Sequence, residues 1–401
     1  MPPCPSLVGS MASVERARLL GRTDVVTPIE DFNERLAEGR QLRIKLGLDP
    51  TAPAVTLGWA VVLRKLRDFQ EQGHVAVLIV GDFTAQVGDP SARNETRKRL
   101  TAEEVRGYAS QVLSQFEKVL LPEPLEIRYN SEWLASLDMA EILNLTSVAT
   151  VAQLLERSDF AKRFEAKSPI SVMEFLYPLL QGYDSVAVEA DVELGGSDQL
   201  WNLMMGRVVQ ERYGQRPQVA MTMPLLVGTD GVQKMSQSLG NYIGVDEPAA
   251  EIFGKVMSLR DEAMPAWFRL ATELSEQEIE DAKALHPRAA KAVLARVITA
   301  LYTSESEADA AAAEFDRVFR QGEEPTDIEE FPLPVEDPIN VATLLRAAGV
   351  VDSAKEARRL LAQGAISTDE RRLTEEWVAR SLLANRVLKI GKRRYLRLVA
   401  N

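Results

Sequence analysis

The chain has 401 residues, of which 46% are hydrophobic and 26% charged, and a net charge of -12. The length predicts two or three domains, and the composition is that of a soluble globular protein. No apolar run is long enough to span a membrane. A single cysteine, Cys4, excludes a disulfide framework, and the two histidines, His74 and His286, are too few and too far apart for a zinc site or a serine-histidine triad.

The first part of the chain predicts a parallel sheet. Residues 1–40 are expected to form a tail and then a helix from residue 15 onward. Residues 42–49 have strand character, apolar residues at helical spacing follow until Gly73, and residues 75–80 form a continuous apolar run. Strand, helix and strand in this order favour a Rossmann-type, doubly wound α/β fold.

Further strands are expected at residues 125–129, 185–194 and 219–227, which would complete an α/β domain over residues 41–245. Beyond Pro248 the pattern is almost wholly helical, which predicts an α-helical domain over residues 246–322.

The remaining residues predict a linker and a small basic domain. Residues 323–338 are rich in proline and acid and lack periodicity, so they are expected to be a linker. Residues 339–401 would form a small α+β domain with thirteen Lys and Arg against six Asp and Glu, a local charge of +7 that leaves -19 on residues 1–338. An acidic body with a basic tail is expected when one module binds RNA and another performs chemistry.

No signal for export precedes these domains, because the opening residues lack a charged start followed by an apolar core. The protein is therefore expected in the cytoplasm. His74 and His286 are predicted to be surface residues without a catalytic role.

Polar residues gather where the predicted strands end. LGLDPTAPAVTLGWAVVL, residues 46–63, offers a strand end, Asp49 and the start of a helix, whose free N–H groups would favour an anionic ligand. An ordinary strand-to-helix connection is the simpler interpretation of this segment alone. GDFTAQVGDPSAR, residues 81–93, adds a second loop with Asp82 and Asp89.

A third cluster lies in a predicted helix. Tyr177, Gln181 and Asp184 follow one another at spacings of four and three, so they share one helical face. They could belong to a solvated face, but apolar neighbours such as Phe175 and Leu179 favour a pocket wall.

The ordered set LGLDPTAP, GDFTAQVGDPS, LLQGYDSVAVEADVELGGSDQ, MPLLVGTDGVQKMSQSLGNYIG and the basic tail resembles bacterial tyrosyl-tRNA synthetases of class I. The match runs from about Leu19 to the C-terminus. The resemblance implies a Rossmann-type catalytic domain with a dimer-forming insertion, a helical anticodon-recognition domain, a tail like a ribosomal RNA-binding protein, and a homodimer. It also implies tyrosine, ATP and tRNA as partners, with ATP as a substrate together with Mg²⁺, and no tightly bound cofactor or metal ligands of the protein.

Site residues follow from the same resemblance. Asp184 would accept a hydrogen bond from the phenol of tyrosine, and the other tyrosine-binding positions are Tyr177, Gln181, Gln199, Asp89 and Lys45. The nucleotide-binding positions are Gly47, Asp49, Thr51, Gly58, Gly195, Gly196 and Lys234. The catalytic positions are Lys234, Ser236, Thr56, Trp59 and Arg93. The RNA-binding positions are Lys355, Arg358, Arg359, Arg371, Arg372, Lys392 and Arg393.

The chain departs from the family at its two signatures. The His-x-Gly-His signature is replaced by Thr56-Leu57-Gly58-Trp59, and Lys-Met-Ser-Lys-Ser is replaced by a segment with Gln237 in place of the second lysine. Groups that act on developing charge are worth about 3 to 4 kcal/mol each, so these losses should slow adenylate formation unless Lys234 and cations such as Arg93 and Arg97 compensate.

Three functions remain open from the sequence. The first is a tyrosine–tRNA ligase that forms tyrosyl-adenylate and transfers tyrosine to tRNA. The second is a diverged paralogue that binds tyrosine or an analogue and has redirected or lost this chemistry. The third is a non-catalytic protein that senses tyrosine or RNA.

Overall fold

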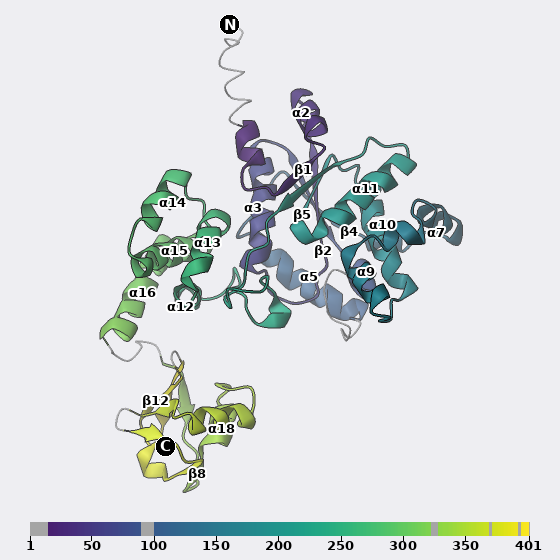
Figure 1. Cartoon of the computed structure of the whole chain (residues 1–401). Coiled ribbons are helices and arrows are strands. Elements are labelled where there is room, and N and C mark those ends of the chain that lie inside the picture. The colour runs from purple at the N-terminus through teal and green to yellow at the C-terminus, as the bar shows by residue number, and fades with distance from the viewer. Residues whose placement is uncertain (1–14, 90–99, 322–327, 369–370, 392–393, 401) are drawn as a thin grey trace. The chain divides into compact units, whose positions relative to one another are not determined.

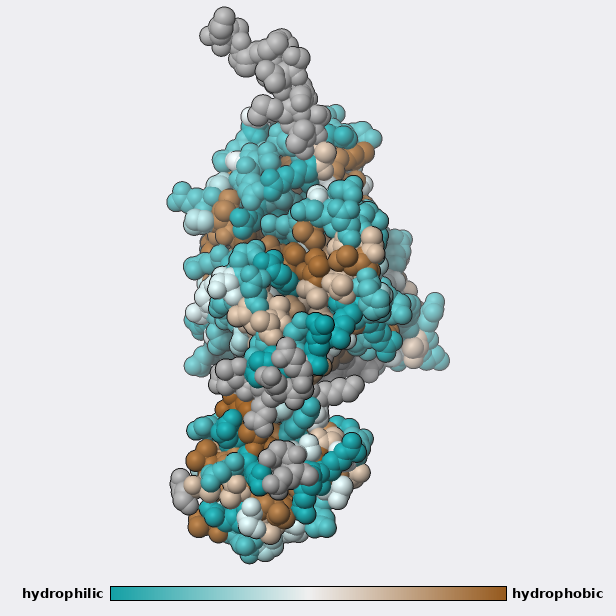
Figure 2. All heavy atoms as spheres, turned by 90° about the vertical axis from the view of Figure 1, so that its left-hand side faces the viewer, coloured by the Kyte–Doolittle hydropathy of each residue, from teal (hydrophilic) through white to brown (hydrophobic). Residues whose placement is uncertain are grey.

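A computed structural model describes residues 15–89, 100–321, 328–368, 371–391 and 394–400. The chain divides into two compact units, Met1–Ala312 and Ala313–Asn401 (Figure 1). Figure 2 shows hydrophilic side chains over much of one face, interrupted by patches of hydrophobic ones. No helix among the described residues is long and apolar enough to cross a membrane.

The first unit is built on a six-stranded sheet of order β1-β6-β5-β2-β3-β4. Its strands are β1 (Val25–Thr27), β2 (Arg43–Leu48), β3 (Val75–Val80), β4 (Leu125–Tyr129), β5 (Val192–Gly196) and β6 (Val219–Met223). All neighbouring pairs are parallel except β1 with β6. The chain winds outward through β2, β3 and β4 and then returns to β5 beside β2, as a doubly wound fold does.

This topology confirms the predicted fold class, and it places the reversal of strand order between β2 and β5. In open α/β sheets, ligands bind beyond the carboxyl ends of the strands at such a reversal. The helices that contact the central strands are α3 (Leu57–Glu71), against β2, β3 and β5, and α11 (Leu200–Arg212), against β5 and β6.

Further helices belong to the same unit. They are α2 (Ile29–Ala37), α4 (Thr84–Val87), α5 (Ala102–Phe116), α6 (Ser131–Leu134), α7 (Met139–Thr146), α8 (Val151–Leu154), α9 (Ser158–Glu165) and α10 (Val172–Ala187). The expected helical region follows as α12 (Ala249–Met257), α13 (Met264–Ala271), α14 (Glu276–Lys283), α15 (Pro287–Tyr302) and α16 (Glu305–Asp316). As far as Ala312, within α16, this region belongs to the same compact unit as the sheet.

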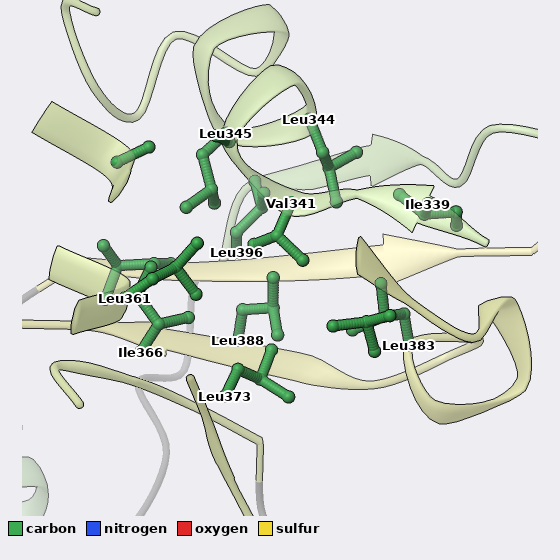
Figure 3. Close-up of a cluster of buried hydrophobic side chains, with 14 of the residues drawn as sticks. Ile339, Val341, Leu344, Leu345, Leu361, Ile366, Leu373, Leu383, Leu388 and Leu396 are labelled. Carbon is green, nitrogen blue, oxygen red and sulfur yellow. The ribbon is translucent and has the colours of Figure 1, made fainter. Parts of the chain in front are cut away.

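The second unit has its own core. Its five-stranded sheet has the order β10-β9-β12-β13-β7, and β11 pairs with β8. The elements are β7 (Glu330–Pro332), β8 (Ile339–Asn340), α17 (Val341–Ala347), α18 (Ala354–Ala362), β9 (Ile366–Ser367), β10 (Arg372–Leu373), β11 (Trp377–Val378), β12 (Val387–Ile390) and β13 (Arg394–Val399). Figure 3 shows leucine, isoleucine and valine side chains from the helices and strands meeting in one cluster, among them Leu345, Leu388 and Leu396.

Two predicted elements were wrong at the start of the chain and before β5. The helix expected over residues 15–40 is interrupted by β1, whose β-branched Val25 and Val26 pair with β6 and which Pro28 separates from α2. The strand expected from residue 185 is helical as far as Ala187, and β5 starts at Val192 after Glu189 adopts a positive φ of 50°.

Three further predictions also need correction. The strand expected over residues 219–227 ends at Met223, because Pro224 cannot donate to the ladder. Part of the expected linker is structured, since β7 pairs with β13 in parallel. His74 is buried rather than at the surface, and its Nδ1 accepts the Leu42 N–H at 3.3 Å, whereas His286 is exposed and caps α15.

Candidate active site

A cavity of about 300 Å³ lies at the carboxyl ends of the central strands. Gly47 and Asp49 reach it from the end of β2, and Gly195 and Gly196 reach it from the end of β5. The sequence-predicted residues that line it are Gly47, Asp49, Thr51, Thr56, Gly58, Trp59, Asp89, Tyr177, Gln181, Asp184, Gly195, Gly196, Gln199, Lys234 and Ser236. Residues far apart in the sequence thus meet where the strand order reverses. Arg93 lies outside the described residues.

Helix α10 provides one wall of the cavity. Ser171 and Glu174 form a capping box that fixes the start of the helix. Tyr177, Gln181 and Asp184 all face the cavity, and Asp184 is only 3% exposed. The stripe is therefore a pocket wall and not a solvated face.

Asp184 is a buried acceptor at this wall. Trp133 donates its indole N–H to Oδ1 at 2.8 Å, and Asn130 donates from Nδ2 to Oδ2 at 3.3 Å. Burial raises the pKa of Asp184 to about 6, although Lys45 and the two hydrogen bonds act in the opposite direction. The carboxylate is held rigidly and can still accept a hydrogen bond from a ligand hydroxyl.

Sequence reasoning missed the two donors, Asn130 and Trp133. They belong to the YNSEWL segment that follows β4, a strand that was predicted correctly. A polar residue directly after a parallel strand, at its carboxyl end, was the available signal.

Asp49 is a second, partly buried carboxylate of the cavity. Its Oδ2 accepts the Tyr177 hydroxyl at 3.0 Å, and its Oδ1 accepts the Thr84 hydroxyl at 2.7 Å. Burial raises its pKa to about 7, and the nearby charges of Asp89 and Asp184 contribute to the increase. Gly81 makes this packing possible, because a Cβ there would lie 2.0 Å from Asp49 Oδ1.

Asp89 completes an acidic lining. Gln199 donates to its Oδ2 at 3.0 Å, and the guanidinium of Arg157 lies 3.5 Å from its Oδ1. Because Asp49, Asp89 and Asp184 line the same cavity, a ligand that carries a cationic group is favoured there. Within the described residues, no group of three His, Cys, Asp or Glu side chains is arranged to hold a metal ion.

Lys45 lies beneath the cavity and does not line it. Its side chain is fully buried, and Nζ lies 2.9 Å from Glu193 Oε1, 2.7 Å from Ser185 Oγ and 2.8 Å from the Gln181 carbonyl. A fully buried ion pair depends on both partners being present. Lys45 therefore supports α10 from below, and the structure does not bring it to the cavity with the other predicted tyrosine-binding residues.

The altered first signature begins α3. Thr56 caps this helix, because its side chain accepts a hydrogen bond from the Trp59 backbone N–H at 3.3 Å. Trp59 itself lines the cavity. The N–H groups of the first turn were expected to be free for an anion. They are not, because Leu57 N donates to Ile243 O at 2.8 Å and Gly58 N donates to Met235 Sδ at 3.2 Å.

The altered second signature lies along the same cavity. Lys234 is paired with Asp198 at 2.7 Å, and the hydroxyls of Ser236 and Ser238 are 2.9 Å apart. Lys234 is exposed, and side chains of its length can change rotamer to meet an anionic ligand. Gln237 instead contacts the backbone of Ala54.

The predicted RNA-binding residues lie in the second unit. Lys355, Arg358 and Arg359 are on α18. Arg372 is the first residue of β10, and Arg371 directly precedes it. Arg358 donates to Glu376 at 3.0 Å. Lys392 and Arg393 lie outside the described residues.

A doubly wound sheet with an amino-acid-sized cavity at its strand reversal, lined by apolar side chains and a few polar ones, is the architecture of a nucleotide-dependent enzyme of the Rossmann type. The family of class I tRNA synthetases (W and Y) matches residues 37–320, and the chain belongs to this family. Similar proteins within this family are tyrosine–tRNA ligases. The tyrosine–tRNA ligase of Moorella thermoacetica is 48% identical over 93% of this chain and 92% of its own, and that of Carboxydothermus hydrogenoformans is 47% identical over 92% and 93%.

Solved structures agree in fold. A truncated Aspergillus nidulans mitochondrial tyrosyl-tRNA synthetase superposes with a TM-score of 0.65 at 20% identity, over 79% of this chain and all of that one. An Archaeoglobus fulgidus tyrosyl-tRNA synthetase solved with L-tyrosine gives a TM-score of 0.60 at 22% identity, over 75% and 99%. The chain is therefore a member of the tyrosine–tRNA ligase group within the class I family.

Proposed function

We propose that the chain binds tyrosine and ATP, forms tyrosyl-adenylate with release of pyrophosphate, and transfers the tyrosyl group to tRNA. The observation that carries the proposal is Asp184, a buried carboxylate fixed by Trp133 and Asn130 at the wall of a cavity that Asp49 and Asp89 also line. A phenol hydroxyl satisfies this acceptor, and a side chain without a donor leaves it unpaired at a cost.

We propose the following roles for the other residues of the cavity. Tyr177, Gln181, Gln199 and Asp89 lie where they can hold the ammonium and carboxylate of tyrosine. Gly47, Gly195 and Gly196 allow a nucleotide to approach the backbone, and Lys234 and Ser236 would contact its phosphates with Mg²⁺ as the counter-ion. No covalent enzyme intermediate is required, because positioning and charge stabilisation carry both steps.

We further propose a homodimer. Large apolar side chains stay exposed on the segment from α7 to the start of α10, and they are Met139, Leu143, Val151, Phe164 and Val172. Figure 1 places α7, α9 and α10 on one side of the first unit, and α7 contacts α10. Exposed apolar groups of this size on neighbouring elements are typical of an interface.

The second unit is proposed to bind tRNA. The basic residues of α18, Lys355, Arg358 and Arg359, together with Arg371 and Arg372, give it a positive charge within an acidic chain. A basic surface attracts the phosphate backbone. The cytoplasm, where tRNA charging takes place, is the proposed location.

Exchange of labelled pyrophosphate into ATP tests the first step, and acylation of tRNA tests the second. Tyrosine-dependent exchange followed by charging is the expected result. Tyrosine binding without exchange would refute the proposed reaction, and it would favour the sensing role.

A further inference from the structure

Gln237 makes a contact that the signature lysine it replaces could not make. The Ala54 N–H donates to Oε1 of Gln237 at 3.3 Å, and Nε2 of Gln237 donates to the Ala54 carbonyl. One carboxamide thus pairs with both backbone groups of one residue, as a neighbouring strand would. A lysine ammonium donates but cannot accept, so it would leave the Ala54 N–H without this partner.

The contact joins two segments that line the same cavity. Ala54 belongs to the connection between β2 and α3, which contributes Asp49, Thr51 and Thr56 to the lining. Gln237 belongs to the segment 234–238, which contributes all five of its residues. These segments are 183 positions apart in the sequence.

Neighbouring contacts hold Met235, Ile243 and Val245 against the end of the connection and the first residues of α3. Met235 is buried and its sulfur accepts the Gly58 N–H, Ile243 O accepts the Leu57 N–H, and the Val245 N–H donates to Val55 O at 2.9 Å. Gln237 is the side chain that extends this row of contacts to the outer end, next to Lys234 and Ser236. The row occupies the N–H groups at the start of α3.

We propose that Gln237 is a positioning residue, a clasp that holds residues 234–238 against the β2–α3 connection before any nucleotide binds. This inference rests on the proposed function. The replacement exchanges a cation that could meet phosphate for a neutral side chain that orders the segment carrying Lys234 and Ser236. The ordering cost of the segment is then met in the free protein, so ATP binds to a prepared site. The ordered segment therefore compensates for the missing lysine by raising the affinity for ATP. The lost positive charge still limits the rate of the chemical step.

Amide hydrogen exchange of the full chain without ligands tests the clasp directly. Two hydrogen bonds of ordinary strength predict that Gln237→Ala speeds exchange over residues 51–58 and 234–243 by roughly 5- to 100-fold. Gln237→Lys should do the same, because it cannot accept from Ala54. Gln233→Ala is the matched control, since Gln233 is an exposed glutamine of the same loop that does not line the cavity, and it should leave exchange unchanged.

Kinetics of pyrophosphate exchange test the consequence. Gln237→Ala should raise KM for ATP by roughly 5- to 100-fold with kcat little changed, and Gln237→Lys should raise KM and kcat together. Unchanged hydrogen exchange in Gln237→Ala, or equal acceleration in Gln233→Ala, would overturn the clasp whether or not the protein is a ligase. Faster hydrogen exchange with an unchanged KM for ATP would overturn the positioning role. A protein with no pyrophosphate exchange at all refutes the proposed function, and the hydrogen-exchange result still decides the clasp.

Discussion

Asp184→Ala is the substitution that most directly probes recognition of the phenol. It removes an acceptor that is 3% exposed and leaves the Trp133 indole N–H without its partner, whereas the Asn130 amide keeps its hydrogen bond to the Thr84 hydroxyl at 3.0 Å. A hydrogen bond to a charged group contributes about 1.5 to 3 kcal/mol, which corresponds to a loss of tyrosine affinity of about 10- to 150-fold. Calorimetric titration with tyrosine measures this loss.

Phenylalanine serves as the matched ligand in the same titration, because it differs by the hydroxyl alone. The preference of the wild-type protein for tyrosine over phenylalanine should largely disappear in Asp184→Ala. If tyrosine affinity were unchanged, the assignment of Asp184 would be wrong. If both ligands lost affinity equally, Asp184 would act through the shape of the cavity and not through the phenol.

Protonation of Asp184 should make the preference for tyrosine depend on pH. The pKa of Asp184 is raised to about 6, so the carboxylate is ionised above this pH and gains a proton as the pH falls through it. The protonated form is a weaker acceptor, so the preference for tyrosine over phenylalanine should fall between about pH 7 and pH 5. Using the ratio of the two ligands removes the contribution of Asp49, whose pKa of about 7 affects both. A ratio that stays constant with pH would refute this account.

Three further substitutions test the rest of the site and its surroundings. Trp59→His restores an imidazole at the start of α3 and should raise kcat/KM for ATP by about ten- to a hundredfold in pyrophosphate exchange, with tyrosine affinity as the unchanged control; no gain would show that the indole is not what limits the reaction. Lys45→Met leaves Glu193 buried without its ion-pair partner and should lower the free energy of unfolding in urea by about 3 to 5 kcal/mol. The second substitution Glu193→Gln should recover part of this loss, and a loss below about 1 kcal/mol would contradict the support of α10 by Lys45. Leu143→Glu places a charge in the proposed interface and should convert dimer to monomer in light scattering, whereas Leu285→Glu, another exposed leucine, should not; a monomeric wild-type protein would refute the interface.

Local sequence patterns predicted the strands β2, β3 and β4, the fold class and the α10 wall of the cavity. These features depend on local periodicity, which is written in consecutive residues: the apolar run Val75–Val80 fits a strand covered on both faces, and spacings of four and three bring Tyr177, Gln181 and Asp184 to one side of a helix. The resemblance to a family then supplied roles that periodicity could not give.

Which side chains meet depends on how the strands and helices are arranged in space. Trp133 reaches Asp184 because the chain after β4 returns over α10, Lys45 lies under the cavity because β2 pairs with β5, and Gln237 finds Ala54 across 183 positions of sequence. Likewise, β1 is a strand because β6 is beside it, and the N–H groups of α3 are occupied because residues 235–243 lie against them. Partners of this kind depend on the order of strands in the sheet, and no local pattern of residues specifies that order.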